Sequence, residues 1–440
     1  MTATTTNTPS RDRSTGRIGR FGWSAVALGV FATAWGGNEF TPLLVMYRQM
    51  DDLSAVVVDA LLFTYVLGIV PALLIGGPLS DRLGRRPLMV PAPLFAALGS
   101  ALIAIGGGSV PMLAVGRIFS GIALGLAMAV GGSWIKELSD RDGAGPGVGA
   151  RRAAMSLTAG FGLGAGVAGV LAQWGPWPQV LPYLVNIAMA LVATVLLSGV
   201  PETRARERNP GRLLDDLKIP AASHRRFLTV VAPVAPWVFG AAASAYAIIP
   251  ALMSTQTGAA PIAFAALCCL LALSAGLIIQ TVGRRIDSPH GVRGVAVALL
   301  MLVVGMGLAA VAADLLTVWM ALIAATVLGC AYGLALISGL LEVQRIAGPD
   351  DLAGLTAVFY GLSYLGFAVP AILAWIAQTW IRVTYADMFV FGMVAALICL
   401  VVVVVGHRRH RLVPAPGLSD TPDRSDTPDR SDTPDRSDTV

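Results

Sequence analysis

Twelve stretches of about 20 apolar residues follow one another along this 440-residue chain, and they restrict its fold more than any other feature. A helix of about 20 residues spans the hydrocarbon of a bilayer and satisfies its own backbone hydrogen bonds there. Charged residues make up 13% of the chain, compared with about 25% in soluble domains. We therefore predict an all-α integral membrane protein with 12 transmembrane helices. These are expected near residues 22–46, 54–77, 87–107, 110–135, 153–173, 178–200, 227–252, 260–281, 292–313, 315–341, 353–377 and 384–406.

The basic residues predict how these helices cross the membrane. With a cytoplasmic N-terminus, 28 of the 31 Lys and Arg residues fall in loops or tails on that side. Such a bias marks the cytoplasmic face of membrane proteins. We therefore expect both termini in the cytoplasm, at the cytoplasmic membrane of a bacterium, and no nucleic-acid partner for the basic loops. The lipid bilayer and a small-molecule substrate are the expected partners of a monomeric chain.

Loops and tails divide the sequence into five segments. Residues 1–20 and 407–440 are polar, and the latter repeats Ser-Asp-Thr-Pro-Asp-Arg, so we expect two disordered cytoplasmic tails. An Arg-rich linker, 201–226, separates two six-helix halves, 21–200 and 227–406.

A charged motif follows the second apolar stretch. It contains Gly77, Asp81, Arg82, Gly84, Arg85 and Arg86. Its aspartate can pair with a basic residue or cap a helix, the second glycine suits a turn at positive φ, and the arginines can contact an anionic inner leaflet. A degenerate copy after the eighth stretch contains Gly276, Gln280, Gly283, Arg284 and Arg285. The alternative interpretation is an ordinary turn rich in Gly and Arg.

The first motif resembles the loop motif between helices 2 and 3 of the major facilitator superfamily, Gly-x-Leu-Ala-Asp-Arg-x-Gly-Arg-Arg/Lys. Its degenerate copy lies at the equivalent place in the second set of six helices, as an internal repeat would. The resemblance implies two pseudosymmetric six-helix halves. It also implies that Asp81 and its arginines stabilise an outward-facing state against helix 11, whose start at Asp350 and Asp351 offers a helix N-terminus.

Three ionisable residues fall within the predicted helices and are functional candidates, because charge at membrane depth is costly. They are Glu39, Asp59 and Arg117. The segment around Arg117 resembles the helix-4 motif of proton-coupled exporters, although Ser120 stands where Gln is usual. The resemblance implies that Arg117 faces Glu39 across a central cavity and controls its protonation. A static ion pair is the alternative, and Asp59 is expected in water at the outer interface.

The remaining cavity candidates are neutral and mostly aromatic: Asn38, Trp237, Tyr246, Tyr332, Tyr360 and Tyr364. Aromatic side chains suit a lipophilic solute, although packing or an interfacial belt would also explain them. The glycines from Gly160 to Gly169 resemble the helix-5 motif of drug:proton antiporters, with Ala165 in place of the usual Pro. Close packing of small residues is the alternative.

The sequence therefore predicts a secondary transporter, driven by the proton gradient and exporting a small lipophilic compound. An importer or facilitator of a sugar or other metabolite is the alternative within the same fold, and a non-transporting membrane sensor is a further one. The sequence contains neither a phosphate-binding loop of the Gly-x-x-x-x-Gly-Lys-Ser/Thr type nor a recognisable hydrolase motif. We therefore expect no enzyme activity, no cofactor and no metal.

Overall fold

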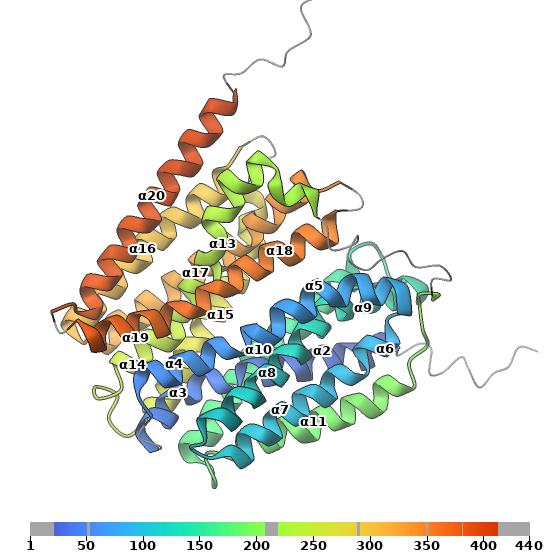
Figure 1. Cartoon of the computed structure of the whole chain (residues 1–440), viewed down its shortest axis with the longest axis horizontal. Helices are drawn as coiled ribbons and strands as arrows, with labels where there is room; N and C mark the ends of the chain where they lie inside the picture. The colour runs from blue at the N-terminus through green and yellow to red at the C-terminus, as the bar shows by residue number, and fades with distance from the viewer. Residues whose placement is uncertain are drawn as a thin grey trace, which may run out of the picture.

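The computed structural model describes residues 22–50, 53–206, 219–287, 291–348, 351–380 and 382–411. Every regular element among these residues is a helix (Figure 1). Eleven helical segments are long and apolar enough to cross a membrane. A further crossing is divided at Glu39 into α2 and α3, each shorter than a span. The predicted all-α fold with 12 transmembrane helices is confirmed.

The first half contains six crossings joined by short turns. Gly107, which has a φ of 50°, forms the tight connection between the third and fourth of them. Their elements are α2 (Gly22–Asn38) with α3 (Phe40–Met50), α4 (Ala55–Thr64) with α5 (Val66–Leu83), α6 (Arg86–Met89) with α7 (Pro91–Gly106), α8 (Val110–Leu126) with η1 (Ala127–Gly131) and α9 (Gly132–Arg141), α10 (Val148–Trp174), and α11 (Leu181–Ser198).

The second half begins after a short turn of 3₁₀-helix, η2 (Pro220–Ser223). Its seventh crossing contains two π-helical segments close to Pro236 and Pro250, which remove backbone donors from the helix. The elements are η3 (Phe227–Val231) with α13 (Ala232–Ala243), η4 (Ser244–Ile248) and α14 (Ile249–Leu252), α15 (Pro261–Ile286), α16 (Arg293–Leu315), α17 (Val318–Ile346), α18 (Leu352–Tyr364) with η5 (Leu365–Ala368) and α19 (Val369–Thr379), and α20 (Tyr385–Arg411).

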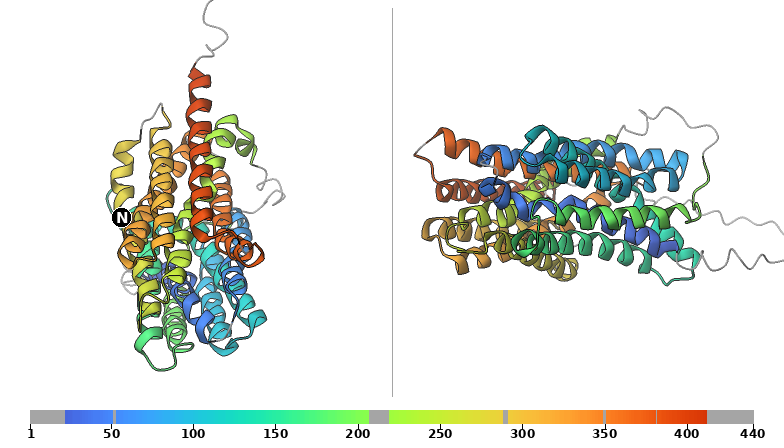
Figure 2. Two further views of the ribbon diagram at one scale, coloured as in Figure 1. Left: turned by 90° about the vertical axis from the view of Figure 1, so that its left-hand side faces the viewer. Right: turned by 90° about the horizontal axis from the view of Figure 1, so that it is seen from below.

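The helices cover all 12 predicted stretches, but several extend past the predicted ends, for example α3 to Met50, α5 to Leu83 and α15 to Ile286. Helix α20 continues to Arg411, so 407–411, predicted to be disordered tail, are helical. The predicted disorder of 1–20, and of the tail from 412 onward, lies outside the described residues. The helices of both halves run lengthwise through the molecule, roughly parallel or antiparallel to one another (Figure 2).

The two halves touch through small residues on α10 and α15. A Cβ placed on Gly169 of α10 would lie 2.4 Å from the Cβ of Ala266 on α15, so the contact leaves no room for a larger side chain. Lipid gives helices no hydrophobic drive to associate, and close approach of backbones provides the packing contacts instead. On the other side of α10, the backbone of α2 lies against Gly160 and Gly164. The helix-5 glycines therefore form packing faces.

Candidate functional site

A stack of aromatic rings crosses from one half to the other in the middle of the bundle. Phe239 of α13 stacks on Tyr364 of α18 and on Phe367 of η5, with ring centroids 4.4 and 4.9 Å apart. Tyr65, which joins α4 to α5 in the first half, meets Tyr364 and Phe367 edge-on at 6.1 and 5.5 Å. Such offset and edge-to-face geometries are the favourable ones for aromatic pairs. The phenol of Tyr364 also donates to Sδ of Met128 across the halves, at 3.2 Å.

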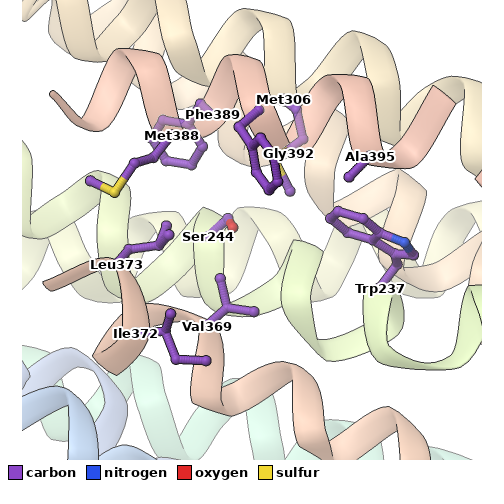
Figure 3. Close-up of a pocket in the computed structure, with 11 residues that line it drawn as sticks. Trp237, Ser244, Met306, Val369, Ile372, Leu373, Met388, Phe389, Gly392 and Ala395 are labelled. Carbon is purple, nitrogen blue, oxygen red and sulfur yellow. The ribbon is translucent and has the colours of Figure 1, made fainter. Parts of the chain in front are cut away.

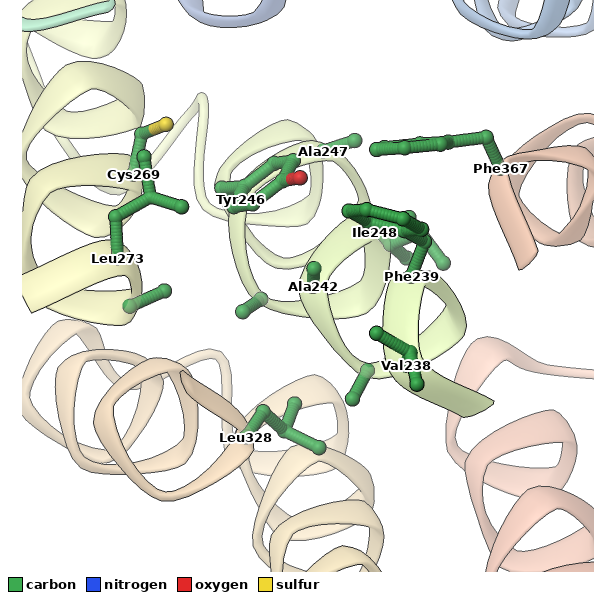
Figure 4. Packing of buried hydrophobic residues seen from close by; sticks show 14 of the residues in the cluster. Val238, Phe239, Ala242, Tyr246, Ala247, Ile248, Cys269, Leu273, Leu328 and Phe367 are labelled. Carbon is green, nitrogen blue, oxygen red and sulfur yellow. The ribbon is translucent and has the colours of Figure 1, made fainter. Parts of the chain in front are cut away.

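Three predicted cavity tyrosines lie around this stack. Tyr332 is 5.8 Å from the ring of Phe239, Tyr246 is 6.5 Å from Phe367, and Tyr360 is 6.5 Å from Tyr364. Asn38 lies close to the contact between the halves, where its amide donates to the carbonyl of Phe161 at 2.9 Å and reaches Sγ of Cys269 at 3.5 Å. Figure 4 shows Tyr246, Phe239, Phe367 and Cys269 around the core of the seventh crossing.

Trp237 does not join the other cavity candidates. Its indole points toward α20, where Nε1 lies 3.5 Å from Sγ of Cys399. The reason is helical phase: Trp237 precedes Phe239 by two residues, or about 200° around a helix of 3.6 residues per turn. Sequence reasoning missed Tyr65, Phe239 and Phe367, because aromatic residues are common at lipid-facing and packing positions and carry no motif of their own.

Glu39 is completely buried at the break between α2 and α3. Its Oε1 lies 2.8 Å from Oγ of Ser100 on α7, and that hydroxyl lies 2.9 Å from Oδ1 of Asn186 on α11. The amide of Asn186 is oriented by donating to the carbonyl of Ala32. Ser100 has one hydrogen and two acceptors in reach, so both contacts are hydrogen bonds at once only when Glu39 donates a proton to Ser100.

Arg117 is also completely buried, but it does not form an ion pair with Glu39 among the residues described. Its Nη1 donates to the carbonyl of Gly37 at 3.2 Å, and its guanidinium lies 4.4 Å from the ring centroid of Tyr65 and 4.7 Å from that of Phe40. The two side chains are near enough to interact electrostatically, but they are not in ion-pair contact. Glu39 points to the third and sixth crossings, whereas Arg117 points to the aromatic stack.

The expectation for Asp59 is wrong. Its side chain is 3% exposed and pairs with Nη2 of Arg48 at 2.5 Å, instead of lying in water. Arg48, which follows the first predicted stretch (22–46), belongs to the last turn of α3. The helix continues past the predicted end at residue 46, and this brings the cation over the first turns of α4. A buried carboxylate needs such a partner.

The motif between the second and third crossings forms an ionic cluster. Nη1 of Arg85 contacts Oδ1 of Asp81 at 2.9 Å, and its Nη2 contacts Oε1 of Glu137 on α9 at 2.9 Å. Arg204, after the sixth crossing, also approaches Asp81, at 3.4 Å. We call the end of the bundle that holds this cluster the basic end. Although burial disfavours the charge of Arg85, its bonds to Glu137 and Asp81 raise the pKa of the guanidinium.

Glu202 ties the same motif to the segment that follows α11. Its carboxylate accepts from the backbone N–H groups of Arg85 and Arg86, each at 2.9 Å, and from those of Thr203 and Arg204. Gly84, with a φ of 102°, allows this approach, since a Cβ there would lie 2.5 Å from Oε2 of Glu202. Partial burial opposes the charge, but the N–H donors outweigh it and lower the pKa of Glu202.

The described partners of Asp81 lie in the first half and in the segment after it, not at helix 11. Asp350 lies outside the described residues, and Asp351 is the N-cap residue that precedes α18. At Gly77, the first glycine of the motif, no heavy atom of the described residues lies within 4 Å of the position of a Cβ, so this glycine makes no close contact with another helix. The ribbons of α5 and α18 diverge toward the basic end (Figure 1).

The degenerate copy holds its half together differently. Gly276 and Gly283 pack closely on α17, against Tyr332 and Leu334. Gln280 is partly exposed and Arg285 is exposed, and the side chain of Arg284 is not among those described.

The second half contains an ionic cluster that was not predicted: Arg345 pairs with Asp287 and Glu342, and Arg226 pairs with Glu342 at 2.7 Å. The sequence signal was Glu342 and Arg345, three residues apart at the end of an apolar helix.

At the opposite end of the bundle, the halves are joined by Gln173 of α10. Its Oε1 accepts from the backbone N–H groups of Ile262 and Ala263, at 2.9 and 3.2 Å, and its Nε2 donates to the carbonyl of Ala259 at 2.9 Å. These N–H groups belong to the first turn of α15, where a helix leaves donors unsatisfied. One side chain of the first half therefore caps a helix of the second.

Two six-helix bundles that meet at a central aromatic site, with buried charged side chains in each bundle, define a polytopic membrane transporter. A family model of the Major Facilitator Superfamily matches residues 26–369. The chain belongs to this superfamily of transporters, as its motif predicted, and not to an enzyme family.

Similar proteins agree with this assignment. A triacylglyceride transporter from Mycobacteroides abscessus is 31% identical over 151 residues, which are 34% of this chain and 28% of that protein, so the match spans less than a third of the relative. Crystal structures of the nucleoside transporter NupG and of a mutant of that transporter share the fold. They superpose with TM-scores of 0.66 and 0.65 at 12% and 13% identity, over 90% and 89% of this chain and 100% and 99% of theirs.

Proposed function

We propose that this transporter exports a small lipophilic compound across a bacterial cytoplasmic membrane in exchange for protons. The observation that carries the proposal is the aromatic stack of Tyr65, Phe239, Tyr364 and Phe367, to which both halves contribute. A solute between the halves would meet ring faces and edges, which suit an apolar or aromatic compound and do not replace the hydration of a sugar or a polyanion. The partial relative is named a transporter of a lipid, which also favours this substrate class.

Proton coupling is supported by Glu39. The carboxyl is buried without a cation in ion-pair distance among the described residues. The contacts of Ser100 with Glu39 and with Asn186 are both hydrogen bonds when the carboxyl carries a proton. An ionised carboxylate would be costly in these surroundings. Movement of α2 relative to α7 would change those contacts. We therefore assign Glu39 as the proton-carrying group, with Arg117 acting on the aromatic site and Asp59 neutralised by Arg48.

We assign the basic end to the cytoplasm because of the bias in Lys and Arg. On this assignment we propose a state closed toward the outside and accessible from the cytoplasm, which is supported by the contacts of Gln173 and of the small residues of α10 and α15 at the outer end. Export would alternate this state with one in which the outer contacts open. The transporter is proposed to act as a monomer and without a cofactor, using the proton gradient as its energy source.

The test uses purified protein in sealed proteoliposomes with an imposed pH gradient. We expect movement of lipophilic cations or neutral lipophiles against that gradient, with protons moving the opposite way, as recorded by an entrapped pH-sensitive dye. Sugars and nucleosides are the comparison panel. Transport of a sugar or nucleoside, without any lipophile, would establish the importer alternative and overturn the proposal.

A further inference from the structure

A cavity lies inside the second half, away from the aromatic stack. It has a volume of about 180 Å³ and is lined by residues of α13, η4, α16, α19 and α20 (Figure 3). This volume is smaller than the range of about 300–1,000 Å³ that is typical of sites for drug-sized molecules, so the cavity suits a slender occupant. Trp237, which was predicted in the central site, forms one wall of this cavity instead.

The cavity opens sideways, into the membrane. Two of its lining residues are strongly exposed, Ile372 of α19 at 51% and Phe391 of α20 at 75%, and both helices belong to candidate spans. The lining residues on α20 run from Met388 to Ala395, about 5 to 15 Å from its first residue at 1.5 Å per residue. The opening therefore lies within the hydrocarbon of the leaflet opposite the basic end.

The lining offers no polar group to a ligand. The hydroxyl of Ser244 donates a hydrogen bond to the carbonyl of Gly240 at 2.8 Å, and the indole N–H of Trp237 is directed at Sγ of Cys399. The rest of the wall is aliphatic, aromatic or methionine, and the flexible side chains of Met306 and Met388 can adapt to the shape of an occupant. A headgroup or a charged solute would lose its hydration here without compensation.

From this geometry we propose that the cavity is a binding site for an acyl chain of a membrane lipid in the outer leaflet. The bilayer is the medium at the opening, its chains are apolar and flexible, and they are present at high concentration. This site does not depend on the proposed substrate or on proton coupling. Because α19 also packs on α4 of the first half, a bound chain would contact a helix that takes part in the interface between the halves.

The test uses the full chain in nanodiscs made with a phospholipid that carries a diazirine in its acyl chain. After photolysis, peptide mapping should place crosslinks on Met388 and Gly392, above the level at the lipid-facing surface residues Ile398 and Val402 of the same helix. Ala395→Trp fills the cavity, and should reduce this labelling about tenfold if contacts worth two methylene groups are lost. Gly392→Leu is a second filling variant, since a Cβ there meets only Met306, at 3.5 Å.

Val394→Trp is the matched control, because Val394 lies beside Ala395 on α20, is 45% exposed and does not line the cavity. Its labelling pattern should match that of the unmodified protein. Equal labelling of Gly392 and of the exposed surface, or labelling unaffected by both filling variants, would overturn the proposal. So would loss of the crosslinks on adding a transported lipophile, because the cavity would then be a substrate site.

Discussion

The carboxyl of Glu39 and the hydroxyl of Ser100 lie 2.8 Å apart in the interior of the first half, and both are completely buried. This contact joins the break between α2 and α3 to α7, and Asn186 extends it to α11. Three crossings of one bundle are thus connected through a single titratable group. The connection lies inside that bundle and not between the halves.

Glu39→Gln is expected to abolish proton-driven transport and to retain exchange of substrate across the membrane. The amide can occupy the same space and bond to Ser100, but it cannot take up or release a proton. The measurement compares pH-driven uptake with counterflow in proteoliposomes. Asp59→Asn is the matched control, because that acid is also buried but is paired with Arg48. Persistence of pH-driven flux in Glu39→Gln would remove Glu39 from the mechanism.

Phe239→Leu is expected to weaken binding of a lipophilic substrate by about 3- to 10-fold, since an aromatic pair contributes about 0.5–1.5 kcal/mol beyond its buried area. Binding is measured by fluorescence or calorimetry on the purified protein. Phe95→Leu serves as the control, because Phe95 stacks on Phe119 within the first half, 6.0 Å away and apart from the central stack. If both variants weaken binding equally, the stack has no special part in recognition.

Gln173→Leu is expected to shift the protein toward the state open at the outer end. Each hydrogen bond contributes about 1 kcal/mol, so the loss of the bonds to Ile262, Ala263 and Ala259 should change the ratio of the two states by about tenfold or more. Distances between spin labels on the outer ends of the two halves report this ratio. An unchanged distance distribution would show that Gln173 does not hold the halves together.

Arg85→Ala should lower the free energy of unfolding by about 1–2 kcal/mol. Bonds to charged groups contribute about 1.5–3 kcal/mol, and the partial exposure of Asp81 and Glu137 reduces this value. Arg85→Lys keeps the charge without the planar fork, and should recover part of the loss. Arg285→Ala, at the exposed position of the second copy that corresponds to Arg86, should have no effect on thermal stability in detergent.

Glu202 should make the basic end sensitive to acid. Its pKa is lower in the folded protein than the ordinary value of about 4.3, so its contribution to stability is complete above that pH and disappears as the pH falls through the folded pKa. The difference in melting temperature between the unmodified protein and Glu202→Gln should therefore be largest near neutral pH and vanish in strong acid. A difference independent of pH would assign the effect to packing.

Much of the fold could be predicted because a backbone in lipid must satisfy its own hydrogen bonds, which allows few structures. Apolar length determined the 12 crossings, and the distribution of Lys and Arg predicted which loops share a side. Side-chain direction could not be predicted in the same way. Asp59 was misplaced because α3 is a few residues longer than predicted, which brings Arg48 into contact with it. Trp237 was misplaced because its position around the helix axis directs it to α20 and not to the central site.

The candidate site was predicted in part for a related reason. Glu39, Arg117 and the tyrosines were recognisable as unusual residues at membrane depth, but their partners come from other crossings. Ser100 and Asn186 belong to no motif in the sequence. They can be recognised as site residues only from the structure, in which α7 and α11 lie against the break at Glu39. Phe239 and Phe367 are likewise distinguished from other phenylalanines only by the packing of the seventh and eleventh crossings.

Gly366 in η5 lies so close to α13 that a Cβ would come within 2.3 Å of the backbone of Gly240 and of Pro236. No side chain separates the seventh and eleventh crossings at that point, so neither can slide past the other without a backbone collision. The two must travel together when the transporter changes state. Phe239 and Phe367 would then keep their mutual geometry throughout the cycle, and the ring that changes its surroundings would be Tyr65, on the opposite half.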